Sequence, residues 1–255
     1  MSKLLIGMAV VVGAVSAFPV LAQEPLPAGG LYAGSPYLGD LRNSLVYGDI
    51  WERPELSKRD RSLITIGVLQ ALTREELAIH IPRGLDNGLT PAEISEIILH
   101  VTFYAGWPTG VQASLTAAEA FQELGVSIGP LRRAPAESAR VLIVPDQTGN
   151  RAYAAVPKLG ELRNSVLFGD VWERPQLLKR DRSLLTMAVL QALYATNELR
   201  IHIGRALDEY GVTAQEVSET ILHVTFYAGW AAAINAGRLA ADAFEERGVD
   251  FSRLQ

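Results

Sequence analysis

The chain has 255 residues, with 23 Lys and Arg against 28 Asp and Glu, so its formal net charge is −5. This mild acidity gives no support to nucleic-acid binding, which usually needs a basic surface. The chain contains no cysteine, which excludes disulfides, a thiolate nucleophile and metal centres bound through thiolates. With 49% hydrophobic residues it can bury a substantial core, and its length allows one large domain or two small ones.

The first 22 residues are typical of a secretory signal peptide. Lys3 is followed by an uncharged apolar stretch at Leu4–Val15, and Val20-Leu21-Ala22 has the small-residue pattern of a cleavage site. The alternative is an uncleaved membrane anchor, because this region approaches the ~20 residues that span a bilayer. Pro19 and the Val-x-Ala ending favour cleavage. We therefore predict a signal peptide at residues 1–22 and a periplasmic or secreted protein that has no membrane attachment after cleavage.

Most of the remaining sequence is a duplication. The run ILHVTFYAGW at residues 98–107 returns unchanged at residues 221–230. Three shorter motifs also recur: LRNS at 41–44 and 162–165, WERP at 51–54 and 172–175, and KRDRSL at 58–63 and 179–184. A repeat of about ninety residues is too long for a solenoid unit, so it indicates a duplicated domain. We place the two copies at residues 37–126 and 158–249, with a linker at residues 127–157.

The pattern within each copy is helical. Apolar residues follow helix spacing, and few segments alternate like strands. In the first copy, start and stop signals predict helices over about 57–72, 73–86, 90–104 and 108–124. One of these starts is a capping box, Thr90-Pro91-Ala92-Glu93, which returns as Thr213-Ala214-Gln215-Glu216. We therefore predict an all-α fold.

All four histidines lie at two positions that recur in both copies: His80 and His202, then His100 and His223. Glu76 precedes His80 by four residues, and Glu198 precedes His202 by four. On a helix this spacing places carboxylate and imidazole on one face, where they can form a hydrogen bond. Such a carboxylate would fix the tautomer of the imidazole and raise its pKa, as a proton-transfer residue needs. The alternative is an ordinary ion pair on a helix surface.

The other histidine position shares a helix face with two aromatic residues. The sets are His100, Tyr104 and Trp107 in the first copy, and His223, Tyr227 and Trp230 in the second. All six are candidate substrate-binding residues. Because His100 lies in the apolar run ILHVTFY, a histidine satisfied within the core or an interface is the favoured alternative. The aromatic residues, likewise, more often pack in a core than against a substrate.

Several spaced motifs recur together in both copies. In the first copy they are the WERP block, Arg59-Asp60-Arg61, Glu76-Leu77-x-x-His80, Thr90-x-x-Glu93 and His100-x-x-x-Tyr104-Ala105-Gly106-Trp107. Their combination resembles the carboxymuconolactone decarboxylase family, over nearly all of the chain after the signal peptide. The resemblance implies two tandem alkylhydroperoxidase-like helical domains and a homo-oligomer, with a trimer of tandem chains favoured. It also implies decarboxylation of a lactone acid without a cofactor.

The wider superfamily includes alkylhydroperoxidases, which use a Cys-x-x-Cys motif with a histidine four residues after the second cysteine. Counted back from His80, these two positions hold Thr73 and Glu76. In the second copy they hold Ala195 and Glu198. Thiol peroxidase activity is therefore excluded.

The main hypothesis is a cofactor-independent decarboxylase, or a related lyase, acting on a carboxylated lactone or keto acid. Loss of carbon dioxide leaves a carbanion or enolate that must be protonated, so an acid poised near neutral pH is needed. We assign this proton transfer to His80 and His202, with Glu76 and Glu198 orienting them.

Two arginines are candidate clamps for a small anionic substrate. Arg53 and Arg174 occupy the same place in the WERP block of each copy, and an arginine can hold a carboxylate through two parallel hydrogen bonds. The alternative is a structural arginine that pairs with a helix end or an acidic neighbour.

The sequence leaves two other functions open. One is a metal site for non-haem iron or zinc, since two imidazoles and a carboxylate can bind either. Its ligands would be Glu76, His80 and His100, with a twin at Glu198, His202 and His223. The other is an exported binding protein that keeps the helical scaffold but has lost the chemistry.

Overall fold

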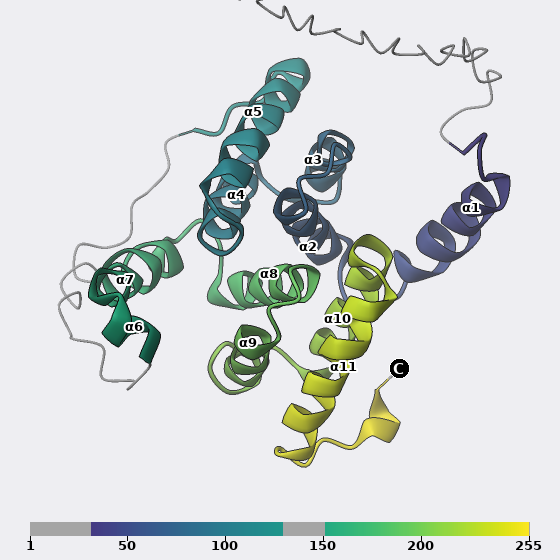
Figure 1. Cartoon of the computed structure of the whole chain (residues 1–255). Helices are drawn as coiled ribbons and strands as arrows, with labels where there is room; N and C mark the ends of the chain where they lie inside the picture. The colour runs from purple at the N-terminus through teal and green to yellow at the C-terminus, as the bar shows by residue number, and fades with distance from the viewer. Residues whose placement is uncertain (1–31, 130–150, 255) are drawn as a thin grey trace, which may run out of the picture.

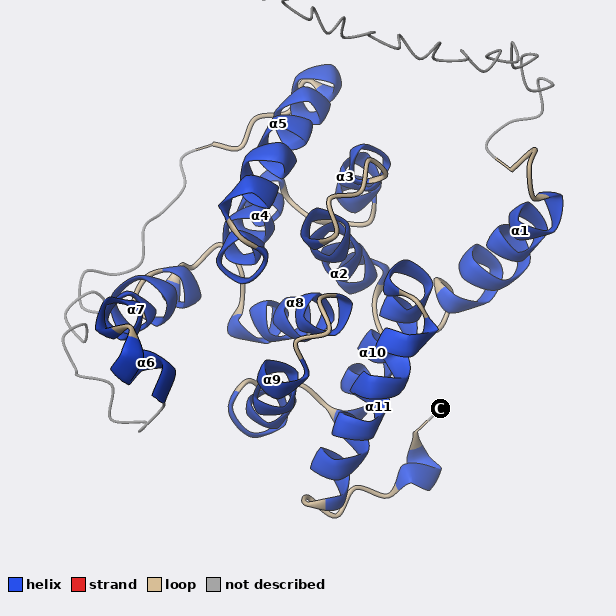
Figure 2. Ribbon diagram, viewed as in Figure 1, coloured by secondary structure: helices blue, strands red, loops and turns tan. Residues whose placement is uncertain are grey.

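The computed structural model describes residues 32–129 and 151–254 (Figure 1). The expected signal peptide and most of the expected linker lie outside these residues. Within them the chain forms helices and turns and contains no strand (Figure 2), so the all-α prediction is confirmed. None of the helices in this part of the chain is long and apolar enough to cross a membrane.

Each copy consists of short helical segments followed by four longer helices. In the first copy these are α1 (Pro36–Leu41), a π-helical segment (Arg42–Ile50), α2 (Lys58–Ala71), α3 (Leu77–Asp86), α4 (Pro91–Ala105) and α5 (Trp107–Leu124). The second copy has α6 (Arg151–Ala155), α7 (Pro157–Leu162), a π-helical segment (Arg163–Phe168), a 3-10 turn (Val171–Glu173), α8 (Lys179–Ala192), α9 (Thr196–Glu209), α10 (Ala214–Ala228), α11 (Trp230–Glu245) and a final 3-10 turn (Phe251–Arg253). Helix α6 lies within the segment that the sequence indicated as a linker.

Side-chain caps set several of these helix starts. The hydroxyl of Ser57 accepts a hydrogen bond of 3.0 Å from the backbone N–H of Asp60 at the start of α2. The capping box of α4 is complete, because Thr90 and Glu93 each accept a hydrogen bond from the other's backbone N–H. The same box starts α10 at Thr213. These starts agree with the sequence prediction, because a cap depends only on residues a few positions apart.

The predicted start of the second helix is wrong. Helix α3 begins at Leu77, not at Thr73, and Glu76 is its N-cap. The backbone of Thr73 has φ = 52°, in the left-handed region, which a right-handed helix cannot contain. Tyr194, just before α9, has the equivalent conformation with φ = 57°. Both copies therefore enter this helix through a turn.

The centre of the fold is a contact between the two copies. Helices α2 and α8 pack against each other in the middle of the bundle, while α10 packs on α2 and α4 packs on α8 (Figure 1). Gly67 of α2 lies so close to α8 that an added Cβ would come within 2.2 Å of the Leu185 side chain. Buried apolar side chains of both copies form one cluster. The two copies therefore share one hydrophobic core.

Buried ion pairs also join the copies. Glu219 of α10 is fully buried and accepts hydrogen bonds of 2.9 Å from Arg61 and from the Nε of Arg53, both in the first copy. The mirrored set joins Glu96 of α4 to Arg182 at 3.0 Å and to Arg174 at 2.8 Å. Buried carboxylates need such partners, because an unpaired charge in the core is strongly destabilising. These contacts place α10 on the first copy and α4 on the second.

Candidate active site

His80 lies among aromatic side chains from both copies. The His80 side chain on α3 is buried, with 6% of its residue surface exposed. Its ring stacks on Trp51 of the same copy at 6.2 Å between centroids. Its other aromatic neighbour is Tyr227 of α10, whose ring meets it edge-on at 5.8 Å. Trp51 donates its indole N–H to the Tyr227 hydroxyl at 3.0 Å. The His80 site therefore requires both copies.

The second copy builds a matching site around His202. Its ring stacks on Trp172 at 6.1 Å and meets Tyr104 of α4 edge-on at 5.8 Å. Trp172 donates a hydrogen bond of 2.9 Å to the Tyr104 hydroxyl. The duplication thus produces two sites, and each takes its tyrosine from the opposite copy.

The other two histidines support these sites from within the core. His223 is fully buried, its Nε2 lies 2.8 Å from the Thr65 hydroxyl, and its ring meets Trp51 edge-on at 5.1 Å. His100 has the matching partners Thr186 and Trp172 in the His202 site. Burial holds the pKa of both imidazoles well below the ordinary value, so they are neutral at pH 7. The favoured alternative for His100, a core or interface histidine, matches this placement.

The metal-site hypothesis grouped the wrong histidines. His80 lies in the site that contains His223, whereas His100 lies in the site that contains His202. In residues 32–129 and 151–254, no three or more His, Asp or Glu side chains are arranged to hold a metal ion. Sequence spacing suggested Glu76, His80 and His100 because they belong to one copy. His100 lies on α4 beside Trp172 and Thr186 of the second copy, which separates it from His80.

The expected pairing of Glu76 with His80 is also wrong. Glu76 is an exposed N-cap residue, and His80 Nδ1 is buried without a hydrogen-bond partner among the described residues. Burial and the positive charges of Arg83 and Arg42 lower the pKa of His80 to about 4. The imidazole is therefore neutral at pH 7 in the empty site, and its pKa is not raised as the spacing suggested.

The pairing of Glu198 with His202 fails for the same reason. Glu198 is exposed in the first turn of α9, and His202 Nδ1 is buried and unpaired within the described part of the chain. Burial and the charge of Arg205 lower the pKa of His202 to about 4. The four-residue spacing does not bring the two side chains together here, because Glu198 faces solvent and the His202 side chain is buried in the core.

The two predicted arginine clamps are paired with buried carboxylates. Arg53 donates to Glu219 through Nε and Nη2, and Arg174 donates to Glu96 through Nε. Both arginines thus match the structural alternative, and the substrate-clamp prediction does not fit their partners. Their carboxylates come from the opposite copy, so nothing in the local sequence indicated the pairing.

Trp107 and Trp230 lie away from the histidines. Each is the first residue of its helix, α5 or α11, with 67% and 70% of its surface exposed. The ring of Trp107 meets the ring of Phe103 edge-on, with 6.5 Å between the two centroids. The prediction that both tryptophans share a substrate site with the histidines is therefore not supported by their placement.

A cavity of about 440 Å³ opens beside His80. Its walls come mainly from the π-helical segment and α3, and α10 adds Phe226 and Tyr227. Apolar side chains such as Leu45 and Ile79 line much of it, and the polar residues facing it include Arg42 and Arg83. Such a mixture of apolar wall and a few polar groups is typical of a small-molecule site.

Arg42 and Arg83 are functional candidates that the sequence reasoning missed. Their guanidinium carbons lie 4.6 Å and 4.8 Å from the centroid of the Tyr47 ring, and Arg83 also donates to the Tyr47 hydroxyl. Neither arginine pairs with a carboxylate in the described residues. Arg74 and Glu76 also line this cavity, but no described carboxylate forms an ion pair with Arg42 or Arg83, which lie next to a neutral imidazole. The recurrence of Arg42 and Arg83 as Arg163 and Arg205 was an available signal.

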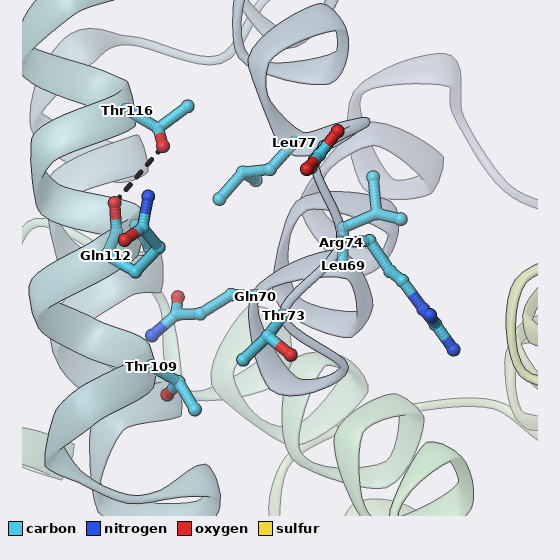
Figure 3. A pocket seen from close by; sticks show the side chains of 10 residues that line it. Leu69, Gln70, Thr73, Arg74, Leu77, Thr109, Gln112 and Thr116 are labelled. Atoms are coloured by element: carbon cyan, nitrogen blue, oxygen red, sulfur yellow. Dashed lines mark hydrogen bonds between the residues drawn. The ribbon is translucent and has the colours of Figure 1, made fainter. Parts of the chain in front are cut away.

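A second cavity, of about 370 Å³, lies between α2, α3 and α5 (Figure 3). Its wall on α5 is polar, with Thr109, Gln112 and Thr116, and the Thr116 hydroxyl donates to the Gln112 carbonyl oxygen at 3.1 Å. Leu69 and Arg74 line both cavities. None of the histidines lines the second cavity, so the chemistry points to the first.

Sequence comparison agrees with this architecture. The family model described as "Carboxymuconolactone decarboxylase family" matches residues 36–120 and again residues 157–242. The chain belongs to the carboxymuconolactone decarboxylase family. Each matched segment contains two of the four histidines, and the two segments together contain all the residues of both histidine sites.

Two relatives within this comparison are named as decarboxylases. A 4-carboxymuconolactone decarboxylase of Acinetobacter baylyi is 45% identical over 82 residues, covering 32% of this chain and 61% of the relative. A nitrosuccinic acid decarboxylase of Metarhizium robertsii is 30% identical over 86 residues, covering 33% of this chain and 60% of the relative. The chain thus spans about three fifths of the length of each relative.

Proposed function

We propose that this family member is a cofactor-independent decarboxylase, or a related lyase, that acts on a carboxylated lactone or keto acid. The observation that carries this proposal is the cavity beside His80, where Arg42 and Arg83 have no carboxylate partner in the described residues. Such a pair of cations favours an anionic ligand. The family membership and the printed names of both relatives support decarboxylation as the reaction.

In the proposed mechanism, a carboxylate of the substrate binds Arg42 and Arg83, and the reacting carbon lies near His80. The bond from this carbon to the departing carboxylate breaks, carbon dioxide leaves, and the electron pair remains on the carbon as a carbanion or, next to a carbonyl group, an enolate. A proton then adds to that carbon. The net reaction consumes one proton for each carbon dioxide released.

The charge of the ligand explains how His80 can supply this proton. In the empty site, burial and two arginines hold its pKa at about 4. A bound carboxylate neutralises part of the arginine charge and adds a negative charge, and both effects raise the pKa of a nearby imidazole. Ligand binding thus raises the pKa of His80 above its value in the empty site and favours the protonated form that a general acid needs.

The direct test is turnover of carboxylated lactones and keto acids, followed by NMR of the product, with His80→Asn as the variant. We expect loss of turnover by roughly 100-fold or more, as for removal of a general acid, with unchanged helical content. Arg83→Gln should mainly raise KM. Full activity in a His80→Asn/His202→Asn double variant would contradict the mechanism. Binding of the acids without turnover would instead favour the exported binding protein.

We also propose that the protein acts after export and as a homo-oligomer. The predicted signal peptide at residues 1–22 supports export to the periplasm or the medium. The exposed rings of Trp107 and Trp230 support burial of these surfaces against further copies. N-terminal sequencing of the secreted or periplasmic protein tests the first proposal. Light scattering tests the second, with a mass of three chains as the expected result.

A further inference from the structure

The two sites of the duplicated chain are not equivalent. The segment from Arg83 to Gly88 reads RGLDNG, whereas the matching segment from Arg205 to Gly211 reads RALDEYG. The second copy therefore has an additional residue, and a glutamate in place of an asparagine. Within the π-helical segments, Tyr47 is also replaced by Phe168. All of these differences lie next to the arginines of the two cavities.

Tyr210 adds a ring contact to the second site that has no equivalent among the described residues of the first. Its ring stacks on Trp172 with centroids 5.2 Å apart and an angle of 27° between the planes. Trp51, the equivalent of Trp172, has Tyr47, His80 and His223 as its ring neighbours and no ring in the place of Tyr210. The additional residue of the second copy thus places Tyr210 against Trp172 in the wall of the second hollow.

Glu209 neutralises the arginine of the second site. The Nε and Nη2 of Arg205 each donate to Glu209 at 3.0 Å, and Arg205 also donates to the Tyr210 hydroxyl. Arg83, by contrast, donates to the neutral hydroxyl of Tyr47. A ligand carboxylate would have to displace Glu209 from Arg205, whereas Arg83 has no such competitor in the described residues. An exposed ion pair is weak by itself, so we expect Tyr210 to contribute as well.

The cavities differ in the same direction. The cavity of the first site reaches both His80 and Tyr227. The hollow of the second site, of about 800 Å³, is lined by Arg205, Glu209 and Tyr210, but neither His202 nor its partner Tyr104 lines it. The second histidine therefore does not face the hollow, although its own surroundings match those of His80.

We propose that only the first site binds a carboxylate ligand, and that Glu209 and Tyr210 exclude such ligands from the second. The chain then has one acid-binding site for two copies of the fold, and these two residues determine which copy is used. This inference rests on the proposed function for the identity of the ligand class. The test therefore uses a carboxylate that the protein is not expected to decarboxylate, so that it measures binding alone.

The test is calorimetric titration of the full chain with succinate, a dicarboxylate chosen because it is not expected to be decarboxylated. We expect one binding event per chain, loss of that event in Arg83→Gln, and an affinity within about twofold of the original in the matched variant Arg205→Gln. Two equal events in the unaltered chain, no binding at all, or loss only in Arg205→Gln would overturn the inference.

A gain of binding gives the sharper test. A variant with Glu209→Asn and with Tyr210 removed restores the sequence LDNG in the second copy. We expect two succinate molecules per chain, and the retained first event shows that the variant is folded. A single event in this folded variant would overturn the role of Glu209 and Tyr210.

The outcomes separate this inference from the proposed function. If succinate binds at one site that depends on Arg83, but none of the carboxylated lactones and keto acids is turned over, the decarboxylase function is refuted and the inference remains intact. Turnover that survives Arg83→Gln but is lost in Arg205→Gln would refute the inference and leave a decarboxylase.

Discussion

The indole nitrogen of Trp51 donates a hydrogen bond of 3.0 Å to the hydroxyl of Tyr227, a residue 176 positions later in the chain. Trp51 is buried in the first copy, and Tyr227 lies on α10 of the second. The rings of both contact His80. This hydrogen bond thus joins the two copies directly beside His80.

Replacement of Tyr227 by Phe should therefore affect both stability and activity. The change leaves the indole N–H of Trp51 without its partner, and an unsatisfied buried donor costs about 1–3 kcal/mol. We expect this loss in the free energy of unfolding, measured by urea denaturation. Tyr104→Phe is the matched control, because it removes the same bond from Trp172. We expect both variants to lose the same amount of stability and Tyr227→Phe to lose more turnover than Tyr104→Phe. Unchanged stability in both variants would contradict the role of the hydrogen bond.

Ligand binding should be coupled to proton uptake by His80. Its pKa is about 4 in the empty site, so at pH 5.5–6 the imidazole is mostly neutral before an anion binds. An anion raises the pKa, and a proton must then be taken up from the buffer. Calorimetric titration in two buffers with different ionisation enthalpies measures the number of protons taken up per ligand bound. We expect this number to lie between zero and one in the unaltered protein and to fall to zero in His80→Asn. Equal heats in both buffers would show that the imidazole is not coupled to the ligand.

The buried histidines should make the fold sensitive to acid. Burial lowers the pKa of His80 and His202 from 6.5 to about 4, so the unfolded chain binds protons more strongly than the folded chain between these values. Stability contributed by their neutral forms is complete above pH 6.5 and is lost as the pH falls towards 4. The expected loss is about 3 kcal/mol for each histidine.

Chemical denaturation at several pH values between 7 and 4.5 measures this dependence. A His80→Asn/His202→Asn double variant should have a flatter profile, because its side chains do not titrate. An identical profile in this variant would assign the acid sensitivity to other groups.

Glu219 should be essential for joining the copies. Its replacement by Gln removes the negative charge that Arg61 and Arg53 share, and leaves Arg61 as a buried, uncompensated charge. The free energy of unfolding should fall by about 3–5 kcal/mol. The control is Glu52→Gln, which removes an exposed partner of Lys58 and should change stability little. A similar, small change in both variants would contradict the structural role of the buried pair.

Short-range features of this protein were predictable from its sequence. The all-α class and the capped starts at Ser57 and Thr90 follow from residues that are close together, the duplication follows from direct comparison of the two segments, and the exclusion of thiol chemistry follows from the absence of cysteine. The failures at this range have a local cause as well. Thr73 adopts a left-handed conformation, so the helix starts later and Glu76 becomes an exposed N-cap instead of a partner of His80.

The composition of the sites was decided only by the tertiary structure. The runs at 98–107 and 221–230 are identical, so the sequence has no feature that tells whether Tyr104 or Tyr227 lies beside His80. The packing of α10 on α2 and of α4 on α8 makes that choice, and it also gives Arg53 and Arg174 their buried carboxylates. Helix caps depend on neighbours within one turn, whereas these pairings depend on how α4 and α10 each contact the opposite copy across a shared core.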